Sequence, residues 1–133
     1  MKRIIILFLI IVSQFFNVAV ANDIDVLERE CLNNTSSTAS MIACTQQAKK
    51  MWQKEMEKYY SLLLDKIPQP NRKNLHNSQK YWLNYQSEQA KLTNELLNEQ
   101  QGTMYLNVRE NLQKQTVKTR AIELRELHNN YVD

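Results

Sequence analysis

The chain has little of what tight turns need, because it contains one glycine and two prolines among 133 residues. Two-residue β-turns depend on residues that tolerate positive φ, so this chain cannot form many hairpins. The scarcity nearly excludes an all-β sandwich or barrel. Apolar residues make up 43% of the chain, which is too many for a disordered polymer. The composition therefore predicts one small, mostly helical domain.

The sequence also lacks the short motifs of common enzymes. It has no Gly-x-Ser-x-Gly elbow, no glycine-rich phosphate loop and no His-Glu-x-x-His pair. The two histidines, His76 and His128, are a poor supply of general bases. Glu55 and Glu57 do not share a helix face, so they make no carboxylate pair. These absences favour a binding protein over an enzyme, and we expect neither a cofactor nor a bound metal.

The first 21 residues have the three parts of a secretory signal peptide. They begin with a positive charge at Lys2, continue with an apolar run over residues 4–12, and end with small residues at Ala19 and Ala21. Polar residues from Ser13 onward interrupt the run before it reaches the roughly 20 apolar residues of a spanning helix. We therefore expect cleavage after Ala21, a periplasmic or secreted protein, and no stable insertion into a membrane.

Cleavage would leave a single helical domain, residues 22–133, that is almost neutral. The signal segment carries two of the 17 basic residues, which leaves 15 against 14 acidic ones. Such a balance is not the footprint of a nucleic-acid-binding protein, so we expect no nucleic-acid partner. It also offers little long-range steering toward a charged protein.

Both cysteines, Cys31 and Cys44, lie after the predicted cleavage position. An even number of cysteines in an exported chain predicts a disulfide, and only one intrachain pairing exists. A reactive thiol or a metal ligand is the alternative. The absence of a Cys-x-x-Cys pair and the distance in sequence to both histidines disfavour it.

Apolar residues recur every three or four positions along three long segments, which predicts three long amphipathic helices. The first begins at Thr38 or Ser40 and ends before Pro68-Gln69-Pro70, the second runs to about Gln101, and the third covers about 104–131. Gly102 separates the last two at a position suited to positive φ. A shorter helix should precede them and end near Leu32. The expected fold is all-α, an antiparallel bundle of three long helices with a short N-terminal helix tethered by the disulfide.

The aromatic residues divide between the predicted core and the surface. Trp52, Tyr59, Trp82 and Tyr85 fall on the apolar stripes, so we expect them to be structural. Tyr81 lies one position off its stripe, as does Tyr60, and both are expected to be partly exposed.

Three carboxylates of the second long segment, Glu88, Glu95 and Glu99, align within about 20° of one another at the helical period. They are candidate contacts for a cationic protein, with Tyr60 and Tyr81 as aromatic anchors. The alternative is a solvated surface that serves only solubility.

The assembled pattern resembles the LprI-type family of exported lysozyme inhibitors. The resemblance extends from Cys31 to about Leu127, and its most specific part is the segment Leu75-x-x-Ser78-Gln79-x-x-Trp82-x-x-Tyr85. The other matching positions are Met41 with Cys44, Tyr60 with Leu63, Gly102, and Arg120 with Leu124. The resemblance implies a helical, exported protein that binds a protein partner such as a lysozyme and occludes its cleft. An envelope adaptor or toxin-immunity module without lysozyme activity is the alternative.

The chain departs from the family pattern at a few positions. It has Gln86 where relatives have arginine and Val117 where they have threonine. Relatives also carry a second cysteine pair near the positions of Ala90 and Leu112, and both of those cysteines are missing here. Their joint absence implies that they pair with each other in relatives, which leaves Cys31 to pair with Cys44.

Overall fold

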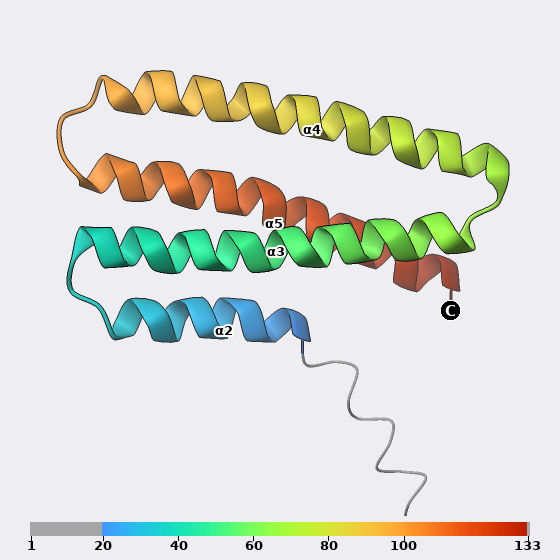
Figure 1. The fold of residues 1–133 in the computed structure, drawn as a ribbon, viewed down its shortest axis with the longest axis horizontal. Coiled ribbons are helices and arrows are strands. Elements are labelled where there is room, and N and C mark those ends of the chain that lie inside the picture. Colours follow the sequence, from blue (N-terminus) through green and yellow to red (C-terminus); the bar gives the residue numbers. More distant parts are fainter. Residues whose placement is uncertain (1–19, 133) are drawn as a thin grey trace, which may run out of the picture.

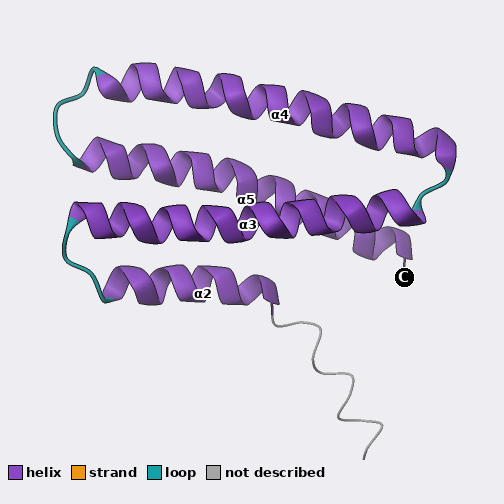
Figure 2. Cartoon of the chain, in the orientation of Figure 1, coloured by secondary structure: helices purple, strands orange, loops and turns teal. Residues whose placement is uncertain are grey.

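The structure is a computed structural model that describes residues 20–132. It contains four helices: α2 (Val20–Asn33), α3 (Thr38–Lys66), α4 (Gln69–Asn98) and α5 (Met104–Val132) (Figure 1). Figure 2 shows that loops alone connect these helices, and the described part of the chain has no strand. The predicted all-α fold is confirmed. The predicted signal peptide falls almost entirely outside the described residues and stays a prediction.

Local sequence explains where the long helices begin and end. The Ser37 side chain caps α3 by accepting a hydrogen bond from the backbone N–H of Ser40 at 3.1 Å. Ile67 is extended because Pro68 follows it, so α3 ends at Lys66. α4 ends at Asn98, three residues before the expected Gln101. Gly102 has a φ of 118°, the positive value expected for the connection to α5.

Consecutive helices run antiparallel, as predicted, but the most extensive contact joins α3 to α5, which run in the same direction (Figure 1). Their shared core is built around Trp52 of α3 and Leu124 of α5, both almost fully buried. The remaining buried members are Ile24, Ala48, Met56, Leu63, Ile67, Val117 and Ala121. The core therefore lies between α3 and α5, with α2 covering one side.

The short helix α2 is held by a disulfide and by ion pairs. Cys31 and Cys44 form the predicted disulfide, with their Cα atoms 5.8 Å apart. Lys114 of α5 donates to both carboxylate oxygens of Glu28 at 2.7 Å, and both side chains are more than nine-tenths buried. Nearby, Lys118 pairs with Asp25. α2 is thus linked covalently to α3 and by charge to α5.

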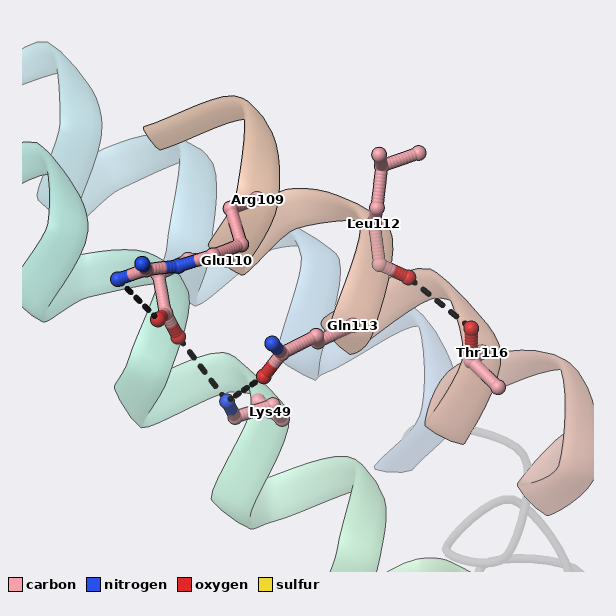
Figure 3. A network of polar contacts seen from close by, with 6 residues as sticks. All are labelled: Lys49, Arg109, Glu110, Leu112, Gln113 and Thr116. Atoms are coloured by element: carbon pink, nitrogen blue, oxygen red, sulfur yellow. Dashed lines mark hydrogen bonds and ion pairs between the residues drawn. The ribbon is translucent and has the colours of Figure 1, made fainter. Parts of the chain in front are cut away.

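A further polar network links α3 and α5 (Figure 3). Lys49 of α3 donates to Glu110 at 3.0 Å and to Gln113 at 3.1 Å, both on α5. Arg109 lies 3.6 Å from the other oxygen of Glu110. The side of α5 that faces α2 and α3 is therefore partly charged, and its charged side chains form ion pairs with residues of those helices.

Helix α4 packs mainly on α5, and Thr93 is its one fully buried residue. Leu75 and Trp82 pack against the core and are partly buried, as is Tyr59 of α3. The expectation that Tyr85 belongs to the core is wrong, because its side chain is 56% exposed. The reason is that, within residues 20–132, α4 lies at the edge of the molecule and packs mainly on one other helix, α5 (Figure 1).

We expect removal of the disulfide by Cys31→Ala and Cys44→Ala together to lower the free energy of unfolding by about 3 kcal/mol. The physical reason is that the disulfide closes a short loop in the unfolded chain. Urea unfolding of the oxidised protein and of the variant measures the difference. An unchanged midpoint in the variant would contradict this account.

The buried pair Glu28–Lys114 gives a second stability test. Glu28→Ala should cost about 3 kcal/mol because it leaves the Lys114 ammonium buried without a partner. The double variant Glu28→Leu, Lys114→Met should be much less destabilised than the single one, since it removes both charges. Lys91→Ala breaks a solvent-exposed pair and should leave the urea midpoint almost unchanged in the same experiment. Equal losses in the single and double variants would be inconsistent with a buried ion pair.

Candidate functional site

The polar residues of the family-like segment meet at Arg120, whose side chain is 9% exposed. Its Nε donates to Oε1 of Gln79 at 3.1 Å and its Nη2 donates to Oγ of Ser78 at 2.9 Å. Nη1 donates to Glu123, one turn further along α5, at 3.2 Å. The planar guanidinium holds its donors in fixed directions, so it can serve these three separate acceptors at once. Arg120 therefore fastens α4 to α5.

Gln79 extends this connection to α3. Its Nε2 lies 3.6 Å from Sδ of Met56, a weak acceptor in the buried core. On the next turn of α4, Trp82 packs against the same core. The Ser78-Gln79 pair thus positions α4 in the structure, and its side chains make their hydrogen bonds within the chain.

The other family-like positions lie outside this cluster. Met41 is half-buried in the first turn of α3, where its N–H donates to the Ser37 carbonyl at 3.0 Å. Tyr60 is half-buried on α3, and its hydroxyl lies 3.3 Å from Nδ1 of His76. Gly102 is exposed, with no atom near the position of a Cβ.

Two cavities lie between α4 and the helices below it. One has a volume of about 230 Å³ and includes Gln86, Ala90 and Leu112 in its lining. The other has a volume of about 270 Å³, lies between α3, α4 and α5, and has Arg120 in its lining. Ala90 and Leu112 thus face one space, at the positions where the family resemblance places the second cysteine pair of relatives. The hydrogen bonds of Arg120 to Ser78 and Gln79 join α4 to α5 across this region.

One side of α4 is uncovered and carries large side chains, which we call the outer face of α4. Tyr81 is 68% exposed, Leu96 is 57% exposed and the Glu88 side chain is 71% exposed. The complete outer face consists of Tyr81, Tyr85, Glu88, Leu92, Glu95, Leu96 and Glu99. Most of these residues are three or four positions apart, the spacing by which a helix presents a surface to a partner. The outer face is thus a continuous surface of aromatic, aliphatic and acidic groups.

The three predicted carboxylates lie in a row along this outer face, and the row begins seven residues after Tyr81. Glu88 accepts a hydrogen bond from Lys91 at 2.6 Å, which raises the pKa of that lysine. Glu95 lies in the last turn of α4 and Glu99 at its C-cap, where the helix dipole disfavours negative charge. Their placement therefore does not serve the stability of α4.

Tyr60 is separate from this group. Its partner His76 lies twelve residues before Glu88 on α4, which is about 18 Å along a helix. The sequence argument that grouped Tyr60 with the carboxylates used exposure alone and carried no information on distance between helices.

Within residues 20–132, no group of three or more histidine, cysteine, aspartate or glutamate side chains is placed to hold a metal ion. No helix of that region is long and apolar enough to cross a membrane. The two candidate functional features are the outer face of α4 and the polar cluster around Arg120 that positions this helix.

We expect Arg120→Met to loosen α4, because the substitution removes the donors to Ser78 and Gln79 while keeping much of the apolar stem. Native-state hydrogen exchange should then speed up in residues 75–93, while the core of α3 stays protected. Arg125→Met is the matched control, since the half-buried Arg125 pairs with the exposed Glu126 alone at 3.8 Å. Exchange in α4 that is equal in the two variants would show that Arg120 does not fasten this helix.

One comparison with known proteins identifies the family. Residues 31–124 match the family model described as lysozyme inhibitor LprI. A crystal structure of an uncharacterized protein from Burkholderia thailandensis superposes with a TM-score of 0.78 at 34% sequence identity. The match covers 83% of this chain, which spans 55% of the length of that protein. No curated protein matches the sequence. Because the family model covers more than half of the sequence, this chain belongs to the LprI family of lysozyme inhibitors.

Proposed function

We propose that the protein binds a lysozyme through the outer face of α4 and inhibits it by occluding its substrate cleft. The observation that carries the proposal is this uncovered face, which combines two tyrosines with three carboxylates on one edge helix. Membership of an inhibitor family supports a binding protein over an enzyme.

The chemistry of the outer face suits a cationic partner. Lysozymes are typically cationic enzymes, so carboxylates can pair with basic groups around the cleft while the tyrosines supply buried contact area. Residues 22–133 are nearly neutral, with 15 basic against 14 acidic residues, but residues 86–101 contain three glutamates against one lysine. Steering toward a basic surface therefore depends on this part of α4, and it should weaken as salt is added.

The shape of α4 supports occlusion. With 30 residues the helix is about 45 Å long, and it forms an edge of the molecule (Figure 1). At its end, the loop of residues 99–103 leads to Met104, whose side chain is 74% exposed. A ridge of this kind can lie along a cleft and exclude the polysaccharide without any chemical step by the inhibitor.

We also propose that the protein acts outside the cytoplasm, in the periplasm or after secretion, with residues 1–21 as its signal peptide. The disulfide between Cys31 and Cys44 supports this location, because disulfides persist in oxidising compartments. That is also where a protein could meet a lysozyme.

The test is the rate of peptidoglycan clearing by a panel of lysozymes in the presence of the oxidised protein. The triple variant Glu88→Gln, Glu95→Gln, Glu99→Gln should weaken inhibition of the susceptible lysozyme by at least tenfold, since pairing with basic groups is lost. Tyr81→Ala should weaken inhibition by a similar factor if this tyrosine is an anchor.

The matched control is the triple variant Glu30→Gln, Glu57→Gln, Asp65→Asn, which makes the same charge change at exposed positions of α2 and α3. It should inhibit like the wild type. Equal losses of inhibition in both triple variants would show that the effect comes from net charge and not from the position of the carboxylates. No inhibition of any lysozyme by the wild type would contradict the proposal and favour the alternative, an envelope adaptor or immunity module.

A further inference from the structure

The outer face of α4 has a second property, which concerns the lysines beside it. Lys73 and Lys80 lie in the first half of α4 and are exposed, and no carboxylate of the described residues is within ion-pair distance of either. Glu88 and Glu95 lie in the second half. The second half also holds Lys91, which pairs with Glu88 at 2.6 Å, so this half has a net negative charge while the first half has a net positive one.

These four charges are placed symmetrically about Asn84. Lys80 and Glu88 are each four residues from it, and Lys73 and Glu95 are each eleven residues from it. Four residues are about one helical turn and eleven are about three, so all five residues lie along one stripe of the helix. Asn84 also lies at the midpoint of α4, which runs from Gln69 to Asn98.

From this symmetry we infer that α4 pairs antiparallel with α4 of a second copy of this chain, about a two-fold axis near Asn84. In that arrangement Glu88 of one copy lies opposite Lys80 of the other, and Glu95 lies opposite Lys73. A two-fold interface repeats each contact, so two residue pairs give four ion pairs. The same register overlaps the two helices along their whole length.

Apolar contacts support the same pairing. Tyr81, Tyr85, Leu92 and Leu96 run along α4 beside the charged stripe and are about half exposed or more. In this register Tyr81 and Tyr85, within three residues of Asn84, lie close to the same residues of the second copy near the axis, whereas Leu92 and Leu96 lie opposite residues 76 and 72. Among exposed large apolar side chains of the described residues, all but Leu27 belong to α4 or α5. Five of these side chains lie on α4, the helix that the second copy would contact.

Pairing would bury the carboxylates that we assign to the lysozyme contact. Self-association and inhibition should therefore exclude each other, so that the inhibitor is released from its dimer when it meets the enzyme. This consequence depends on the proposed function, whereas the pairing itself does not.

Sedimentation equilibrium tests the pairing of two copies in the absence of lysozyme. The sample is the oxidised protein, purified after export. The wild type should show twice the mass of one chain at about 100 μM and dissociate as salt is raised. Two double variants test the register: one carries Lys73→Glu and Lys80→Glu, and the other carries Glu88→Lys and Glu95→Lys. Each should be monomeric, with dimerisation weakened at least tenfold. Mixed in equal amounts, the two variants should form a heterodimer, because every facing pair is then of opposite charge.

A wild type that stays monomeric at this concentration and at low salt would overturn the inference. A dimer that survives either charge reversal, or two variants that fail to associate when mixed, would overturn the register. The variant Lys73→Glu, Lys80→Glu keeps all carboxylates of the outer face, so its inhibition of lysozyme reports on the proposed function separately. Monomeric behaviour with inhibition at least equal to that of the wild type is the expected result.

Discussion

The contact between α3 and α5 is the interaction on which the other helices depend. Trp52, Val117 and Leu124 are almost completely removed from water in it, and they account for much of the apolar burial of a small domain. The two helices run parallel, so the chain needs α4 to return from the end of one to the start of the other. The position of α4 follows from this connection and from its contacts with α5.

That constraint explains why α4 has a fixed position in the bundle while one of its sides is not covered by another described helix. The bundle has a single extended core, and α2 already occupies one side of it through its disulfide and the Glu28–Lys114 pair. α4 is attached by its connections and by the hydrogen bonds of Arg120 to Ser78 and Gln79. A helix held from one side has its opposite side free for a partner. The polar cluster at Arg120 thereby positions the outer face of α4 but does not itself contact the partner.

The sequence was sufficient to predict the number of helices, their approximate ends and the disulfide, because caps, prolines and apolar period act locally. Tyr85, Leu92 and Leu96 share the helical period of core residues, yet they are exposed. Periodicity identifies an apolar stripe but cannot tell whether another helix of the same chain covers it. Tyr85 was therefore expected in the core although it belongs to the uncovered surface.

The opposite difficulty arose on α5, where Glu110, Lys114 and Arg120 are buried. Charged side chains are normally solvated, so a sequence pattern assigns them to the surface unless their partners are known. The partners here are Lys49, Glu28 and Gln79, which lie between 41 and 86 residues away in sequence. The family resemblance included Ser78, Gln79 and Arg120 but carried no information that these three residues contact one another.

The central claim is that the outer face of α4 is the surface that binds lysozyme. Hydrogen–deuterium exchange of the protein, measured with and without a saturating lysozyme that it inhibits, tests this claim most directly. The account predicts slower exchange in residues 81–99 and no change in α2 or in the first half of α3. Slower exchange in α2 and α3 with none in α4 would contradict it.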